Sequence, residues 1–451
     1  MNSTPLAKSL RSRHIAMISI GGIIGAGFFI GASTPISIAG PASLLSYGMA
    51  GLLTFLINCM LRDIALHAPD RGSFVNHIRH TLGAPIGFMT GWIYWLVWVT
   101  TLGMESMALA SLLAPVVHIP YGLIEFLILG FMTGANLLAV HVYGECEYWF
   151  SMLKIIAILV FIMIGVTILV QGHVPVWNNI ASQGLLPHGT MAILAAVPSV
   201  IFSMAGTEVV TIAAGESDDP ARNVASTART VAFRIVAFYL TSIALILCLV
   251  PWNSLVAGQS PFLYTLRAMH VPFAGTAMEI VIVCAMLSTV NSGLYATSRV
   301  MFELAAVRDA PGCFMRLHPV TQAPWITVMF SASAALLIAI TAIFSPDVVF
   351  AFLLNATGAF VIFLYFLIAL CRIRACGFNL LSLLTILLLL CALVAMAQVE
   401  HTRHELETSV GMMVFVVVIA MARRAYGNFS LPGHDGNAPH RDLSSAPPDA
   451  R

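Results

Sequence analysis

Long apolar runs alternate with short polar segments along almost the whole chain. At about 20 apolar residues for each crossing of a bilayer, this pattern predicts an all-α membrane protein with twelve transmembrane helices. The transmembrane domain covers residues 15–425, between an N-terminal segment (1–14) and a tail (426–451) whose Pro, Gly, Ser, Asp and His content is typical of a disordered extension. The predicted spans are 15–38, 42–66, 84–114, 121–141, 148–170, 190–214, 232–252, 274–306, 324–344, 348–371, 378–397 and 409–425.

The composition supports a membrane protein and argues against several other classes. Hydrophobic residues make up 59% of the chain and charged residues 9%, whereas a soluble domain has roughly 25% charged residues. The largest polar pieces are too short for a soluble catalytic domain. The histidines lie at span ends, in loops or in tails, so we expect no intramembrane metal, haem or other cofactor. We also expect the lipid bilayer, but neither nucleic acid nor an obligate protein, as a partner.

Basic residues are distributed unevenly between the predicted loops. If the N-terminus is cytoplasmic, all of the 21 lysines and arginines except Arg267, Arg403 and Lys154 fall in or beside inside loops and tails. Cytoplasmic loops of membrane proteins carry such an excess of Lys and Arg. The distribution therefore predicts that both termini are cytoplasmic.

Small residues interrupt the first and sixth predicted helices. Residues 21–31 read GGIIGAGFFIG, and residues 201–210 read IFSMAGTEVV, with a glutamate inside apolar sequence. Unpaired backbone groups are tolerated at membrane depth only where protein or a cavity surrounds them. Broken helices in corresponding positions are typical of transporters with a binding site near the bilayer midplane. The pattern therefore predicts a transporter.

Three ionisable side chains stand out within the predicted spans, where a charge costs on the order of 3 kcal/mol on insertion scales. Lys154 lies near mid-depth of the fifth span. Because burial favours the neutral amine, it is either a proton carrier or a residue that fixes helix packing by donating to carbonyls. Glu208, just past the second break, is a candidate to gate the pathway or to hold the half-helix in place. Glu105 in the third span would meet a substrate amine or form an interhelical hydrogen bond.

Two polar segments have simpler interpretations. Asp218 or Asp219, before Pro220, predicts a capped helix start rather than a metal site. Residues 69–83 predict either a short helix or hinge on the bundle, or a plain connector.

Six motifs in order resemble those of one transporter family. GGIIGAGFFIG, PDRGSF, GWIYWLVWV, TEVVTIAAGES followed by proline, RIVAFYLTSI and VNSGLYATSRVMFELAAVRDAP resemble the amino acid transporter branch of the amino acid, polyamine and organocation (APC) superfamily, over about residues 10–425. The RSRH sequence before the first helix, Glu105 and VVTIAAGESDDP are most similar to bacterial 4-aminobutyrate permeases.

The resemblance implies a LeuT-type fold. Five helices (15–170) would be repeated in inverted orientation (190–371), with helices one and six broken and two further helices at 378–425. The implied function is import of an amino acid, such as 4-aminobutyrate, by proton symport with alternating access across the bacterial cytoplasmic membrane. The same fold also serves amino acid exchangers and non-transporting sensors, which remain alternatives.

The resemblance also implies a set of site residues. The substrate carboxylate would lie on the backbone amides of Gly25, Ala26 and Gly27, where many members have Thr or Ser in place of Ala26; here that hydroxyl contact is lost or supplied elsewhere. Carbonyl groups of Ile23, Phe202 and Ala205 would accept hydrogen bonds from the substrate amine, and Gly206 would lie in the second break. Lys154 would take the place of the sodium ion of sodium-coupled relatives, with Ser288 as its neighbour. Asn291 is a further candidate for the substrate pocket.

Two other classes fit less well. A major facilitator transporter also has twelve spans, and residues 70–72 match part of a motif of that family, but the rest of the motif and a long central loop are missing. A membrane-embedded enzyme would need a nucleophile, metal or acid pair at depth, and none is evident. We therefore expect a transporter rather than an enzyme.

Overall fold

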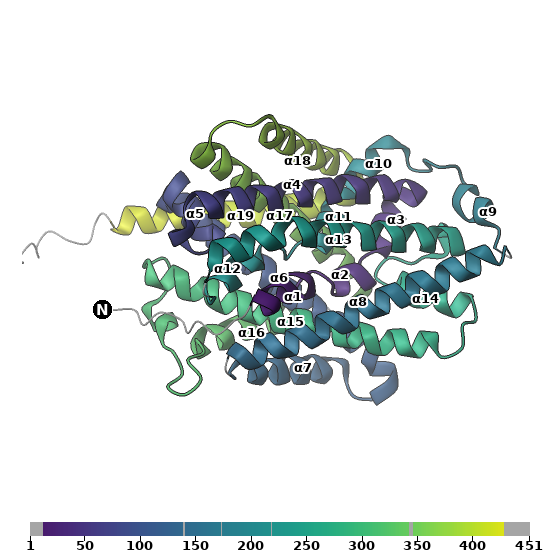
Figure 1. The fold of residues 1–451 in the computed structure, drawn as a ribbon, viewed down its shortest axis with the longest axis horizontal. Helices are drawn as coiled ribbons and strands as arrows, with labels where there is room; N and C mark the ends of the chain where they lie inside the picture. The colour runs from purple at the N-terminus through teal and green to yellow at the C-terminus, as the bar shows by residue number, and fades with distance from the viewer. Residues whose placement is uncertain (1–11, 139, 173, 218, 342–345, 428–451) are drawn as a thin grey trace, which may run out of the picture.

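The computed structural model describes residues 12–427 apart from 139, 173, 218 and 342–345, and every regular element in these residues is a helix (Figure 1). The long helices lie side by side along one axis of the bundle. The first half of the chain contains α1 (Ser12–Gly21), α2 (Ala26–Phe29), α3 (Ser33–Ala39), α4 (Ser43–His67), α5 (Phe74–Leu82), α6 (Ala84–Val117), α7 (Tyr121–Asn136), α8 (Val140–Val170) and α9 (Val176–Ala181). The second half contains α10 (Gly189–Ala195), α11 (Val197–Met204), α12 (Val209–Ala214), α13 (Pro220–Leu249), α14 (Pro261–Ala268), α15 (Ala274–Ala306), α16 (Trp325–Ile340), α17 (Pro346–Cys376), α18 (Leu380–Gln398) and α19 (Glu400–Gly427). Short 3-10 helices lie at Gly40–Ala42, Pro69–Arg71, Trp252–Ser254 and Gly312–Met315.

Several of these helices are suited to a bilayer. Within the described residues, seven are long and apolar enough to cross a membrane by length and composition. Three shorter apolar helices overlap further predicted spans. The seven are 33–67, 84–117, 142–170, 189–214, 274–306, 349–376 and 380–398, and the shorter three are 121–136, 233–249 and 325–340.

Both predicted interruptions are present. Helix α1 ends at Gly21 and α2 begins at Ala26, while α11 ends at Met204 and α12 begins at Val209. Gly206, in the second break, has φ +113°, a conformation that glycine adopts readily and other residues do not. A Cβ at this position would lie 2.8 Å from the carbonyl oxygen of Gly22. The two breaks therefore touch each other in the interior of the bundle.

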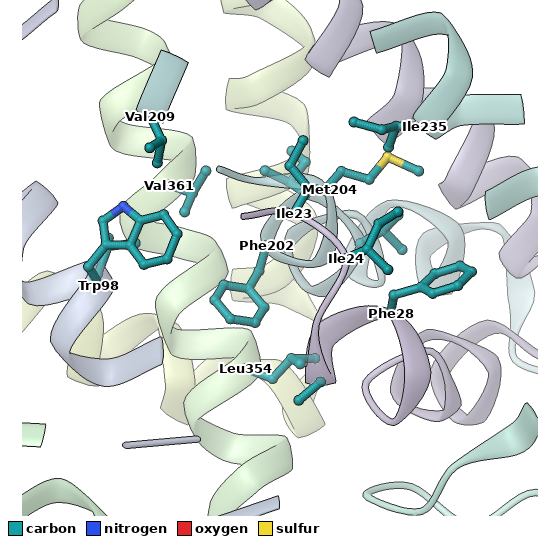
Figure 2. Packing of buried hydrophobic residues seen from close by; sticks show 14 of the residues in the cluster. Ile23, Ile24, Phe28, Trp98, Phe202, Met204, Val209, Ile235, Leu354 and Val361 are labelled. Carbon is teal, nitrogen blue, oxygen red and sulfur yellow. The ribbon is translucent and has the colours of Figure 1, made fainter. Parts of the chain in front are cut away.

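Large apolar side chains hold the breaks in place. In Figure 2, Ile23 and Ile24 lie on the non-helical link before α2, with Phe202 and Met204 of α11 beside them. Phe28 of α2 packs against Tyr239 of α13, with ring centroids 4.3 Å apart. Such close packing, rather than exclusion of water, stabilises helix association within a bilayer.

Helices α8 and α13 begin well before their predicted spans. Helix α8 begins at Val140 rather than at 148, so Lys154 lies at the middle of this helix. Helix α13 begins at Pro220, and the side chain of Asp219 accepts a hydrogen bond from the backbone N–H of Arg222. The predicted capped helix start is therefore present at Asp219, while residue 218 lies outside the described residues.

The polar segment at residues 69–83 forms a helix. Helix α5 packs against α6 and α17, which favours the helical alternative over a plain connector. His77 on α5 is buried, and burial together with the nearby Arg71 charge lowers its pKa to about 4. The imidazole is therefore neutral at physiological pH, as the packed face of α5 requires.

The ends of the chain differ slightly from the predicted boundaries. Helix α1 already begins at Ser12 and α19 continues to Gly427, so residues 12–14 and 426–427 belong to helices. The remainder of the predicted N-terminal segment and tail, 1–11 and 428–451, lies outside the described residues.

Candidate functional site

A small cavity of about 20 Å³ lies where the two breaks meet. Residues of both breaks, of α6 and of α15 line this cavity. Seven predicted site residues are among those that surround it. The lining consists of Gly22, Ile23, Gly27, Val97, Trp98, Thr101, Glu105, Phe202, Ala205, Gly206, Glu208 and Thr289.

The Glu105 carboxylate lies on the first break. The backbone N–H of Ala26 donates to both carboxylate oxygens, at 2.9 and 3.0 Å, and Glu105 is buried. The first N–H groups of a helix lack intrahelical partners and attract negative charge. Gly25 leaves room for this contact, because a Cβ there would overlap the side chains of Glu105 and Thr289. Glu105 thus occupies the position at which the sequence resemblance placed a substrate carboxylate.

Glu208 forms an equivalent contact at the second break. Its carboxylate oxygens accept from the backbone N–H of Gly206 at 3.1 and 3.2 Å. The Phe202 carbonyl accepts from the Ala205 N–H at 3.0 Å, and the Ser203 carbonyl accepts from the Tyr239 hydroxyl. At each break, a backbone N–H that has no partner within its helix therefore donates to a glutamate carboxylate of the protein.

Lys154 joins α8 to the end of α1. Its side chain is fully buried, and Nζ donates to the carbonyl oxygen of Gly21 at 2.5 Å. Ser288, predicted as its neighbour, donates its hydroxyl to Oε1 of Glu147 at 2.5 Å. Glu147 is also fully buried and lies two turns before Lys154 on α8. The structure thus adds a carboxylate to the predicted lysine and serine.

Asn291 lies apart from the central cavity. Its side-chain oxygen accepts from Nδ2 of Asn136 on α7 at 2.8 Å, and it does not line the cavity between the breaks. We therefore interpret Asn291 as a contact between α7 and α15.

Ion pairs join neighbouring helices and loops at one end of the bundle. We call it the arginine-rich end; it comprises the starts of α1 and α8, helix α5 and the end of α15. Arg299 Nε lies 2.9 Å from Oε1 of Glu216, and both side chains are buried. The Arg299 guanidinium lies over the ring of Tyr295, 4.1 Å from its centroid. Further contacts at this end join Arg13 to Glu145, Arg79 to Asp309, and Ser73 to Glu303.

The opposite end of the bundle contains a large cavity. A cavity of about 510 Å³ lies between the last turns of α6, the start of α15 and helix α14. The cavity where the breaks meet is far smaller, at about 20 Å³. A second large cavity, of about 520 Å³, lies between the start of α6, Asp309 and α19. Residues that line the 510 Å³ cavity include Ile30, Met107, Ser111, Tyr264, Arg267 and Phe350.

The chain matches the amino acid permease family over residues 14–423. It belongs to that family. The permease is therefore an integral, multi-pass membrane protein and a transporter of amino acids rather than an enzyme, as the sequence predicted.

Individual relatives show how far the similarity extends. The permease is 37% identical over 375 residues to the gamma-aminobutyric acid permease of Bacillus subtilis strain 168, covering 82% of this chain and 80% of that one. It is 35% identical over 379 residues to the aromatic amino acid transport protein AroP of Corynebacterium glutamicum, covering 82% and 81%. The crystal structure of a manganese transporter from Eremococcus coleocola has a similar fold, with a TM-score of 0.56 at 13% identity, covering 95% of this chain and 97% of that chain.

Several residues of the permease site were not predicted from sequence. Glu147 lies just outside the predicted fifth span, which begins at 148, whereas helix α8 begins at Val140. Arg299 lies inside a predicted span but was counted with the basic residues of the nearby loop. Trp98 and Thr289 carry no signal in a single sequence, because apolar and hydroxyl residues are common throughout the spans.

We expect Arg299→Leu to destabilise the permease strongly, because it leaves the Glu216 carboxylate buried without its cation. Removing one partner of a buried pair costs about 3–5 kcal/mol, whereas replacing both is often tolerated. Thermal unfolding in detergent should show a lower midpoint for Arg299→Leu and a largely restored one for the double variant with Glu216→Leu. The exposed pair Arg403 and Glu407 supplies the control, and an Arg299→Leu effect no larger than that of Arg403→Leu would contradict a stabilising role.

Proposed function

We propose that this permease imports an amino acid, with 4-aminobutyrate as the first candidate, by proton symport with alternating access across the bacterial cytoplasmic membrane. The observation that carries this proposal is the carboxylate of Glu105 on the Ala26 N–H at the first break. A site that binds a carboxylate of the protein has the donor geometry to bind the carboxylate of a substrate. The gamma-aminobutyric acid permeases among its relatives support the choice of the first substrate.

Binding follows from an exchange of carboxylates. The substrate carboxylate takes the Ala26 N–H, and Glu105 moves off the break to face the positively charged amine. Carbonyl groups at Ile23, Phe202 and Ala205 accept the amine hydrogens. Ala26 has no hydroxyl, so the backbone amides of Gly25 and Gly27 supply the remaining donors. The exchange keeps each carboxylate next to a donor or a cation, as a buried charge requires.

Alternating access uses the two ends of the bundle. We assign the LeuT-type arrangement of two inverted five-helix repeats and two further helices to the twelve predicted spans. The ion pairs that join helices at the arginine-rich end and the large cavity at the other end then correspond to a state that opens on the side away from the arginines. Because basic residues favour the cytoplasmic side, the cavity faces outward.

Fusion reporters test this orientation. A reporter that is active only outside the cytoplasm should be active after Val170 and inactive after Arg424. A cytoplasmic reporter should show the reverse. The same sidedness at both positions would contradict the assignment of the arginine-rich end to the cytoplasm.

Counterflow in proteoliposomes tests the substrate. Vesicles preloaded with unlabelled 4-aminobutyrate should take up labelled 4-aminobutyrate well above protein-free vesicles, and external unlabelled 4-aminobutyrate should compete. A panel of aromatic and amide amino acids identifies the preferred substrate. Competition by an aromatic amino acid stronger than by 4-aminobutyrate would replace the proposed substrate, and no counterflow with any amino acid would contradict transport by this site.

The variant Glu105→Gln tests the exchange of carboxylates. Glutamine retains a hydrogen-bond acceptor for Ala26 but cannot neutralise a substrate amine. Losing a charge-assisted hydrogen bond costs about 1.5–3 kcal/mol, so substrate affinity should fall by one to two orders of magnitude. Glu125→Gln, which alters a buried carboxylate on α7, serves as the matched control and should bind like the parent.

A further inference from the structure

Helices α8 and α15 pack against each other along a row of buried polar side chains, which we call the polar seam. The seam residues of α8 are Lys154, Ser151, Glu147 and Tyr143, spaced three to four residues apart. Residues with this spacing lie on one face of a helix. The facing residues of α15 are Ser288, Ser292, Tyr295 and Arg299, again three to four residues apart. All eight side chains are buried.

Consecutive contacts connect the seam. Ser288 donates to Glu147 at 2.5 Å, and the hydroxyls of Tyr143 and Ser292 are 3.2 Å apart. The rings of Tyr143 and Tyr295 stack with centroids 4.3 Å apart, and Tyr295 lies under the Arg299 guanidinium. The polar groups thus continue from the middle of the bundle to the ion pair at the arginine-rich end.

Lys154 and Glu147 meet at the same residue of α1. Lys154 Nζ donates to the Gly21 carbonyl, and a Cβ on Gly21 would overlap the Glu147 carboxylate. Side chains on a helix lean toward its N-terminus, so Lys154 extends along α8 toward Glu147. Ser292 and Asn291 also face the Glu147 carboxylate, and its Oε2 is buried and makes no hydrogen bond among the described residues. This acceptor therefore has capacity for a proton.

The surroundings limit which other groups can exchange this proton. Glu105 on α6 and Cys284 on α15 are the further titratable groups that face Lys154. Tyr143 faces Glu147, and beyond it Glu216 is paired with Arg299. Glu105 is held by the Ala26 amide on the side of the substrate cavity. Glu147 is therefore the carboxylate on the side of Lys154 that leads to the arginine-rich end.

We propose that Glu147 accepts the proton that Lys154 releases during transport and passes it to the arginine-rich end. This step rests on the proposed proton symport through Lys154. One N–H bond of the ammonium breaks, and an O–H bond forms on Glu147, so that a neutral amine and a carboxylic acid replace the two charges. When that end opens and the Arg299 to Glu216 pair separates, the acid gives its proton to water and the carboxylate is restored. In this structure the ion pair is intact.

The decisive variant is Glu147→Gln, which retains an acceptor for Ser288 but cannot take up a proton. Purified variants in proteoliposomes are measured for counterflow, for substrate accumulation under an imposed pH gradient, and for proton entry with an entrapped pH dye. We expect counterflow within about threefold of the parent. In the parent, a gradient of one pH unit supports about tenfold accumulation of substrate for one co-transported proton. The variant should lose this accumulation. The ratio of protons to substrate should fall toward zero, and Glu147→Asp should restore part of it.

Two results would overturn the proposal. One is a proton-to-substrate ratio in Glu147→Gln equal to that of the parent. The other is a proportional loss of counterflow and accumulation in both Glu147→Gln and Glu147→Asp, because a residue with a purely structural role lowers both fluxes together. Glu125→Gln again controls for loss of a buried carboxylate and should remain coupled.

The experiment also separates this step from the proposed function. If the parent protein moves substrate without any proton entry, proton symport itself is wrong. If the parent is coupled and Lys154→Ala is uncoupled while Glu147→Gln stays coupled, proton symport stands and only the role of Glu147 fails.

Discussion

Gly206→Ala will abolish uptake of substrate. The backbone of Gly206 has φ +113°, a conformation that costs a residue with a side chain about 1–3 kcal/mol. The added Cβ would also lie 2.8 Å from the Gly22 carbonyl oxygen, so the two breaks must move apart. A displacement of about 1 Å at a reacting or binding site can reduce activity by two orders of magnitude. We therefore expect uptake at least about 100-fold below that of the parent.

Initial rates of labelled uptake, normalised to the amount of inserted protein, measure this effect. Gly130→Ala on α7 is the matched control, because a Cβ there meets no atom within 4 Å, and it should transport normally. Gly27→Val is expected to fail as well, since a Cβ at this position lies 3.1 Å from Cα of Ser203. Parental uptake rates in Gly206→Ala would show that the contact between the breaks is not part of the site.

Lys154→Ala will lose the ability to concentrate substrate while retaining exchange. The substitution removes the donor to the Gly21 carbonyl, and an unsatisfied buried acceptor costs about 1–3 kcal/mol. It also leaves Glu147 buried without the neighbouring ammonium. The contacts proposed for the substrate lie on the two breaks and α6, so binding should survive. Proton coupling, which requires the amine, should not.

Accumulation of labelled substrate under an imposed pH gradient, with and without a protonophore, measures this loss. Glu208→Gln is the comparison, because it alters the contact with Gly206 and should slow turnover without removing coupling. Accumulation by Lys154→Ala to the parental level would reduce Lys154 to a packing residue. Accumulation by the parent that requires sodium and ignores the protonophore would equally contradict proton coupling.

The breaks and most residues around them could be predicted from sequence, because closely spaced glycines disfavour a continuous helix even where the surrounding residues are apolar. The resemblance to amino acid transporters implied Ile23, Gly27, Phe202 and Ala205 as site residues, and all four line the cavity. Their partners could not be predicted. The contact between Glu105 and Ala26 joins segments 79 residues apart, and nothing local to either segment specifies it.

The polar seam shows a second limit of the sequence. Hydropathy placed the start of the fifth span after Glu147, because the polar residues before it resemble a loop. Neighbouring helices bury Tyr143 and Glu147, and the helix begins at Val140. Asn291 shows a different limit. Its side chain lies within a predicted span, and its oxygen accepts a hydrogen bond from Asn136 of the neighbouring helix α7, a contact that the sequence does not indicate.

If the proposed exchange of carboxylates takes place, Glu105 would also restrict which molecules the carrier accepts. A fatty acid such as butyrate offers a carboxylate to the Ala26 N–H but no amine to Glu105, so the displaced glutamate would lie in a closed space without a partner. A simple amine offers nothing to displace Glu105 from Ala26. On this proposal, only a molecule with both an amine and a carboxylate compensates for the displacement, and in the empty carrier the N–H groups of Ala26 and Gly206 are already bonded to Glu105 and Glu208.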